Sequence, residues 1–186
     1  MIHPDTYVRQ TVKGLGVFAK RNFLRGEILW IADDYDVLIP LKKYLALEPF
    51  TRKKADRYSY LNSDHQAVIA WDEGKYVNHS CAPNSTGILQ FDNISVALRN
   101  IKAHEEIVED YYSYYGHFER FICHCGAPNC RGFIEHDDTY DSSLRLDLKD
   151  VIDAIVEQHP VLLEVKSKYQ REFLGLMQEY YAKMAG

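Results

Sequence analysis

The sequence predicts a mainly β domain made of small folded sheets with short helices, followed by a C-terminal helical hairpin. Two observations lead to this fold class. Over residues 1–120, short runs of β-branched and aromatic residues are separated by glycine-containing turns, which favours small folded sheets over a doubly wound parallel sheet. After Gly132, an acidic linker leads into two segments whose apolar residues recur at helical spacing.

The predicted elements follow in chain order. Strands are expected at Tyr7–Val12, Val17–Ala19, Glu27–Ile31, Val37–Ile39, Gln66–Trp71 and Ile94–Leu98. The turn Gly14-Leu15-Gly16 separates the first two strands. Residues 41–58 favour a helix that is broken near Pro49.

The C-terminal segments have the periodicity of two helices. The first carries Leu148, Val151, Ile152, Ile155 and Val156 and ends at Pro160. The second carries Leu162, Val165, Tyr169, Phe173, Leu176, Tyr180 and Met184. We expect a hairpin that packs on the main domain, and the alternative is a dimerisation or partner-docking arm.

Composition and charge limit the functional classes. A chain of 186 residues with 46% hydrophobic residues can bury one sizeable core. The net charge of -5 argues against direct nucleic-acid binding and favours a cationic partner such as a lysine-rich peptide. Neither a long apolar run nor a signal-like segment is present, so we expect no membrane contact and an intracellular location, in the nucleus or cytoplasm.

Four cysteines carry the most specific chemical signal. Cys123, Cys125 and Cys130 lie in one short loop, and Cys81 lies far upstream. In a reducing compartment, clustered cysteines are more often metal ligands than disulfides. Three thiolates do not complete a tetrahedral site, so we expect Cys81 to be the fourth ligand of one structural zinc. The alternative fourth ligand is a histidine near the cluster, namely His117, His124 or His136.

Four sequence blocks resemble a known family. They are KGLGVFAK (13–20), YVNHSCAPN (76–84), RNIKAHEEIVEDYYSYYG (99–116) and CHCGAPNCRGF (123–133). In this order they resemble the SET-domain lysine methyltransferases that carry a post-SET zinc loop. The resemblance implies a β-clip-like SET architecture. It divides the chain into a SET domain at 1–122 with a variable insert at about 33–70, a zinc loop at 123–134 and a helical extension at 135–186.

The resemblance also implies cofactors and site residues. The cofactor is S-adenosylmethionine, which leaves as S-adenosylhomocysteine. Its expected contacts are Gly14, Leu15, Gly16, Lys75, Tyr76, Asn78, His79, Tyr111 and Phe133. Aligned on the family's GEELxxDYG block, Tyr111 falls on the catalytic tyrosine, and Tyr60 is the best match for a second tyrosine in the lysine channel. Tyr58 is the runner-up for Tyr60, and the alternative for either residue is ordinary core packing.

One residue departs from the family pattern. Glu109 stands two residues before Tyr111, where family members commonly carry Phe or Tyr, a position that tunes how many methyl groups fit in the lysine channel. A carboxylate here points away, holds a water or pairs with the lysine ammonium. The number of methyl groups transferred is therefore left open.

The implied reaction is methyl transfer to the ε-amine of a lysine in a protein or peptide, with histones among the candidates. The amine starts from a pKa of about 10.4, and burial in an aromatic channel beside a sulfonium lowers it. Three other functions stay open: a SET-like binding module without turnover, a zinc-dependent adaptor, and an enzyme for small amines. Asp33, Asp34 and Asp36 are expected either to attract a basic peptide or to form a solvated loop.

Overall fold

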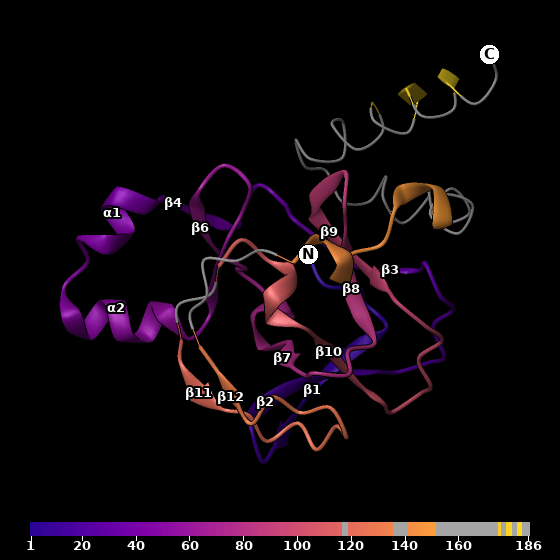
Figure 1. The fold of residues 1–186 in the computed structure, drawn as a ribbon, viewed down its shortest axis with the longest axis horizontal. Coiled ribbons are helices and arrows are strands. Elements are labelled where there is room, and N and C mark those ends of the chain that lie inside the picture. The colour runs from indigo at the N-terminus through magenta and orange to yellow at the C-terminus, as the bar shows by residue number, and fades with distance from the viewer. Residues whose placement is uncertain (117–118, 136–140, 152–174, 176–177, 180–181, 184–186) are drawn as a thin grey trace.

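The computed structural model describes residues 1–116, 119–135 and 141–151, together with residues 175, 178–179 and 182–183 (Figure 1). Short β-strands make up most of its regular structure, so the mainly β class is confirmed. From residue 152 onward, the predicted helical hairpin falls almost entirely outside the described residues. In the described part of the predicted first helix, residues 144–151, the structure has a 3₁₀ turn at Leu148–Asp150 in place of an α-helix, and another 3₁₀ turn, Ser142–Leu144, leads into it.

The largest sheet of the described chain has seven strands in the order β1-β2-β10-β8-β9-β3, with β7 paired to β10. Its strands are β1 (Thr6–Thr11), β2 (Gly14–Ala19), β3 (Ile28–Ile31), β7 (Asn78–His79), β8 (Ser85–Ile88), β9 (Phe91–Ala97) and β10 (Glu106–Glu109). The β1–β2 pair is a tight antiparallel hairpin in which Thr11 faces Gly14. The turn itself is at residues 12–13, so the predicted turn at Gly14-Leu15-Gly16 is wrong: these residues pair with β1 as the start of β2. Gly14 has φ +109°, a conformation that L side chains rarely adopt, so the exit from the turn requires glycine.

A second sheet carries the predicted variable insert. It has the order β4-β6-β5 and consists of β4 (Val37–Pro40), β5 (Ser59–Leu61) and β6 (Gln66–Ile69). Two helices, α1 (Leu41–Leu45) and α2 (Pro49–Asp56), connect β4 to β5 and project to one side of the molecule (Figure 1). The predicted break near Pro49 separates them. Pro49 is the first residue of α2, where its missing N–H costs no helical hydrogen bond.

The predicted zinc loop (123–134) and the two residues before it form a small sheet of their own. Its strands are β11 (Phe121–Ile122) and β12 (Phe133–Ile134), and they pair antiparallel. Ile134 is completely buried and packs with Cys81 and Cys123. The loop between the two strands therefore folds back onto the middle of the chain.

The parallel pairing of β7 with β10 positions the central motifs. Asn78 lies opposite Val108, and His79 lies opposite Glu109. A 3₁₀ turn at Glu73–Tyr76 leads into β7, and another at Tyr111–Ser113 follows β10. As a result, the YVNHS block and the EDYY block lie side by side.

Residues 141–151 belong to the core of the sheet. Leu148 and Val151 are buried against Ile88 and Val96. The Arg145 side chain is also buried, and it donates to the backbone oxygens of Ser113 and Ile88 at 2.8 and 3.2 Å. The chain after the zinc loop therefore returns to support β8, β9 and the 3₁₀ turn that carries Tyr111.

Candidate functional site

Asn78 ties three segments of the site together. Its side-chain amide donates to the backbone oxygen of Leu15 at 3.0 Å and to Glu106 Oε1 at 2.8 Å. A Cβ added to Gly16 would lie 2.9 Å from Asn78 Nδ2 and 2.7 Å from Glu106 Oε1. Gly16 is therefore required by the close approach of β2 to these two side chains.

His79 links the cysteine cluster to Tyr111. The backbone N–H of Tyr111 donates to His79 Nδ1 at 3.2 Å, so the proton of the neutral ring is on Nε2. Nε2 lies 3.3 Å from Cys81 Sγ and donates to it. The side chain is 3% exposed, and it supports both neighbours from the interior of the protein.

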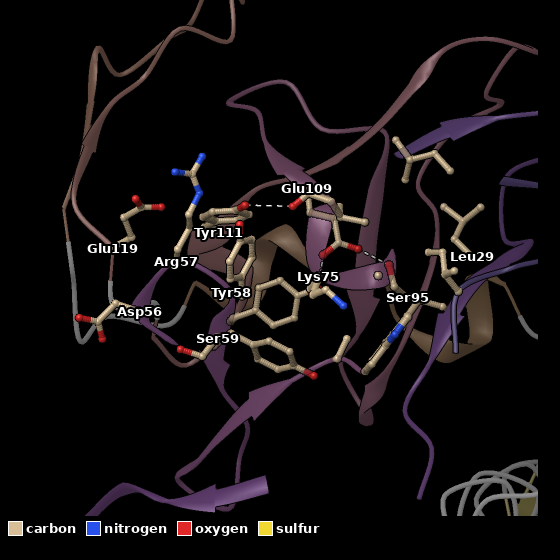
Figure 2. Close-up of a pocket in the computed structure, with 18 residues that line it drawn as sticks. Leu29, Asp56, Arg57, Tyr58, Ser59, Lys75, Ser95, Glu109, Tyr111 and Glu119 are labelled. Atoms are coloured by element: carbon tan, nitrogen blue, oxygen red, sulfur yellow. Dashed lines mark hydrogen bonds between the residues drawn. The ribbon is translucent and has the colours of Figure 1, made fainter. Parts of the chain in front are cut away.

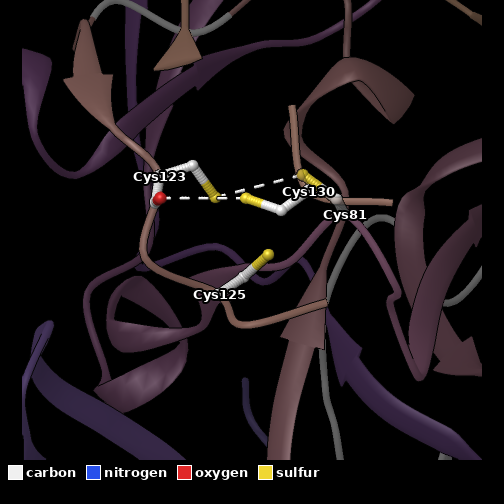
Figure 3. Close-up of side chains that lie close together, drawn as sticks. All are labelled: Cys81, Cys123, Cys125 and Cys130. Carbon is white, nitrogen blue, oxygen red and sulfur yellow. Dashed lines mark hydrogen bonds between the residues drawn. The ribbon is translucent and has the colours of Figure 1, made fainter. Parts of the chain in front are cut away.

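Four cysteines converge on one point, as the sequence predicts (Figure 3). The sulfur atoms of Cys81, Cys123, Cys125 and Cys130 lie within 4.8 Å of one another. The Sγ atoms of Cys81 and Cys123 are 3.9 Å apart, close to the edge of about 3.8 Å of a tetrahedron with Zn–S bonds of about 2.3 Å. Both the donor set and its spacing fit one zinc ion.

Further contacts fasten the cysteine loop to the middle of the chain. The side-chain amide of Asn129 donates to the backbone oxygen of Cys81 at 2.9 Å. The Arg131 guanidinium contacts both carboxylate oxygens of Asp110, at 2.8 and 3.1 Å. Asp110 is 2% exposed and directly precedes Tyr111, so this two-point contact connects the loop to the strand end that carries the tyrosine.

An outer pocket lies between the β1–β2 turn, β7 and the zinc loop. It contains six of the predicted cofactor contacts: Leu15, Lys75, Tyr76, Asn78, His79 and Tyr111. Val12, Phe121 and Ile122 add apolar surface, and Lys13, His124 and Glu119 add polar groups. The other three predicted contacts are not among the lining residues: Gly14 and Gly16 lie in β2, and Phe133 is 45% exposed. In place of Phe133, the partner strand β11 supplies the apolar wall.

An inner pocket adjoins the outer one and is lined by aromatic side chains (Figure 2). Tyr58, Tyr60, Tyr111 and Tyr114 contribute to its walls, and Glu109 contributes a carboxylate. The rings of Tyr60 and Tyr114 are 4.6 Å apart between centroids. The two pockets share Arg57, Tyr58, Lys75, Val77, Tyr111 and Glu119, so they meet at Tyr111.

The predicted tyrosines occupy different places along this path. Tyr111 and Tyr58 stand at the junction, whereas Tyr60 lines only the inner pocket. The Tyr111 hydroxyl donates to the backbone oxygen of Val77 at 2.9 Å, and this bond fixes its orientation at the junction of the two pockets. Burial, followed by the negative charge of Glu109, raises the pKa of Tyr111 well above its ordinary value, so the hydroxyl is neutral near pH 7.

Glu109 is buried and points into the inner pocket. Its two oxygens accept hydrogen bonds from the hydroxyls of Ser95 and Tyr114. The side chain is 5% exposed. The sequence left three possibilities for Glu109, and the one in which its side chain points away from the channel is therefore wrong. Period-two alternation along β10 is the sequence signal for this orientation, because Ile107 also lines the inner pocket.

The acidic segment Asp33–Asp36 has a local structural role that neither sequence interpretation included. Asp33 accepts from the Trp71 indole N–H and the Tyr35 N–H, both at 2.8 Å, and its carboxylate lies 3.1 Å from the amino group of Met1. Asp36 is also buried and accepts from the backbone of Asp33. Of the three aspartates, only Asp34 is exposed.

Several site residues were not predicted from the sequence as functional. Two of them, Tyr114 and Ser95, donate hydrogen bonds to the Glu109 carboxylate, and two others, Asp110 and Arg131, form the ion pair that holds the cysteine loop. These roles depend on contacts between different elements.

None of the helices in the described chain is long and apolar enough to span a membrane.

Comparison with known proteins gives consistent matches. The family model described as SET domain matches residues 14–112, more than half of the 186 residues. The Variant-silencing SET domain-containing protein of Plasmodium falciparum is 34% identical over 145 residues, which is 69% of this chain and 6% of that protein. A Saccharomyces cerevisiae protein named Histone-lysine N-methyltransferase, H3 lysine-4 specific, is 40% identical over 141 residues, which is 70% of this chain and 13% of that protein. The chain therefore spans a small part of the length of these relatives.

A solved chain from Plasmodium falciparum is also similar. It shares 27% sequence identity, and the match covers 59% of this chain and 95% of that chain with a TM-score of 0.44.

Proposed function

Because this chain belongs to the SET-domain family, we propose that it transfers a methyl group from S-adenosylmethionine to the ε-amine of a lysine in a protein. The observation that carries the proposal is the meeting of two unlike pockets at Tyr111, one with a mixed polar and apolar lining, the other mainly aromatic and apolar. Such a junction brings two reactants end to end from opposite sides. Proximity of this kind supplies much of the acceleration in a two-substrate displacement.

The outer pocket has the groups that the cofactor would require. Leu15, Phe121 and Ile122 offer apolar surface for a purine ring, and the Lys75 ammonium offers a partner for a carboxylate. When bound, S-adenosylmethionine supplies an electrophilic methyl group on a cationic sulfur. The residues at the junction hold the incoming amine in line with that group and keep water out.

Tyr111 orients the amine in this mechanism. Its hydroxyl donates to the backbone oxygen of Val77, and in this mechanism the hydroxyl oxygen accepts an N–H of the substrate amine. An amine that donates its N–H groups to acceptors on the wall directs its lone pair along the channel. Tyr58 and Tyr60 line the same channel and exclude water from the reacting nitrogen.

We assign a structural role to the zinc in this proposal. Four thiolates fill a tetrahedral shell and leave no open position for substrate. The ion would hold the cysteine loop against β7 through Cys81. His79 and the Asp110–Arg131 pair would pass this constraint to the backbone of Tyr111.

Histones are the first substrate class to test, because relatives are named histone-lysine methyltransferases. The net charge of -5 is compatible with a lysine-rich partner. We expect the chain to act inside the cell, in the nucleus or cytoplasm.

The test is incorporation of labelled methyl groups from S-adenosylmethionine into core histones and an array of lysine peptides. We expect lysine-specific incorporation, together with cofactor binding by calorimetry. Cofactor binding without incorporation into any lysine substrate would contradict the enzymatic function and support the binding module. Absence of cofactor binding would contradict the assignment of the outer pocket.

A further inference from the structure

Glu109 places a carboxylate inside the inner pocket, and none of the ion pairs of the described residues includes it. The structure describes two polar partners of the Glu109 carboxylate, and both are neutral hydroxyls, those of Ser95 and Tyr114. An uncompensated buried charge is costly. A cationic ligand in this pocket would offset that cost.

The space beside the carboxylate suits an ammonium group. A carboxylate has about four acceptor positions, and the two hydroxyls use two of them. Figure 2 shows the Glu109 carboxylate beside Ser95, with tyrosine rings lining the pocket next to it. The Tyr60 and Tyr114 rings approach to 4.6 Å, and aromatic faces attract cations.

We propose that Glu109 binds the ε-ammonium of the substrate lysine and accepts one of its protons before methyl transfer, a role that rests on the proposed function. The N–H bond breaks and its electron pair becomes the lone pair of the amine, while an O–H bond forms on Glu109. The nitrogen then forms a bond to the methyl carbon as the carbon–sulfur bond breaks and sulfur keeps that electron pair. As the methylammonium product leaves, the Glu109 proton passes to water.

Burial favours this proton transfer. Moving the proton from ammonium to carboxylate converts two charged groups in a mainly apolar pocket into two neutral ones. The charged and titratable groups that line the pocket around Glu109 are Asp56, Arg57, Tyr58, Tyr60, Lys75, Tyr111, Tyr114 and Glu119. The Lys75 ammonium donates to the backbone oxygen of Trp71 at 3.0 Å, and the Arg145 guanidinium lies 5.7 Å from the centroid of the Tyr114 ring.

The first test compares the pH profile of the wild type with that of Glu109→Gln. The amide keeps the shape of the side chain and can hydrogen-bond both hydroxyls, but it accepts no proton. For the wild type we expect kcat/KM on a lysine peptide to be nearly flat from about pH 7 to 9, since the substrate enters as the ammonium and gives its proton to Glu109 inside the pocket. For Glu109→Gln we expect kcat/KM to be about 1,000-fold lower at pH 7 and to rise about tenfold per pH unit toward pH 10, in step with the neutral fraction of the substrate lysine.

The second test is independent of turnover. n-Butylammonium is titrated into the full chain at pH 7 without cofactor, with n-butanol as the neutral probe. We expect the wild type to bind n-butylammonium at least about tenfold more tightly than Glu109→Gln, because the variant lacks the buried charge. n-Butanol should bind equally to both. Glu48→Gln makes the same change at an exposed position at the start of α2 and should behave as the wild type.

The outcomes separate this role from the proposed function. Parallel pH profiles for wild type and Glu109→Gln would overturn the proton-accepting role. Equal binding of n-butylammonium by the two proteins would overturn the cation site. A wild type that methylates no lysine would refute the proposed function alone, and the ammonium titration would still decide whether Glu109 forms a cation site.

Discussion

Replacement of Tyr111 by Phe tests whether the Tyr111 hydroxyl acts in catalysis or only stabilises the fold. In the structure this hydroxyl makes a 2.9 Å hydrogen bond to the backbone oxygen of Val77. Loss of one such bond costs about 1 kcal/mol, which lowers the melting temperature by about 2–4 °C for a chain of this size. Loss of a preorganised polar group beside the reacting atoms costs far more in turnover, about 100- to 1,000-fold.

The assay is single-turnover methyl transfer to a lysine peptide, combined with calorimetry of cofactor binding and of thermal unfolding. We expect Tyr111→Phe to lose turnover by at least about 100-fold while cofactor affinity changes by less than about threefold. Tyr7→Phe is the matched control, because its hydroxyl pairs with His104 at 3.3 Å on the surface, outside both pockets. Near wild-type turnover in Tyr111→Phe would refute the role given to this hydroxyl.

Three further predictions test the zinc site, the turn and the insert. Cys81→Ser should bring bound zinc below one ion per chain and lower the melting temperature by at least about 4 °C, measured by metal analysis and calorimetry; unchanged zinc content would contradict the four-thiolate site. Gly16→Ala should weaken cofactor binding at least about tenfold, since its Cβ would displace Asn78. The control Gly175→Ala, whose Cβ meets nothing within 4 Å, should bind the cofactor as the wild type does. Equal affinities of the two variants would contradict the role of Gly16 in the cofactor site. Burial raises the pKa of Tyr44 to about 12, so the neutral hydroxyl stabilises the fold fully below about pH 10 and this stabilisation is lost as the pH rises through 12. Melting curves between these pH values should decline less for Tyr44→Phe than for the wild type, and identical declines would exclude this contribution.

Local sequence signals predicted the parts of the fold that form between neighbouring residues. The β1–β2 hairpin follows from alternating residues around Gly14, and the break between α1 and α2 follows from Pro49. β7 and β8 were not predicted, because two and four largely polar residues carry no periodic signal. These strands exist because they pair with β10, which is distant in sequence.

The same distinction holds within the site. The spacing of three cysteines predicted a distant fourth cysteine, with a nearby histidine as the alternative, and the structure brings Cys81 to the other three. The outer pocket also contains Asn78 and His79 as expected. By contrast, the contact of Arg131 with Asp110 depends on how the zinc loop folds over β10, and no local pattern encodes that approach.

For a chain that binds zinc and methylates lysine as proposed, the contacts of the cysteine cluster predict that metal binding and turnover are coupled through the backbone of Tyr111. His79 accepts from the Tyr111 N–H on one side of its ring and donates to Cys81 on the other. On the residue before Tyr111, the Asp110 carboxylate is held at two points by Arg131, which follows Cys130 in the loop. If the metal is removed, the loop loses its anchor and both contacts loosen together. Since misplacement of a reacting group by about 1 Å costs about 100-fold in rate, loss of zinc should abolish turnover before it unfolds the β1–β2 and β8–β9 pairs.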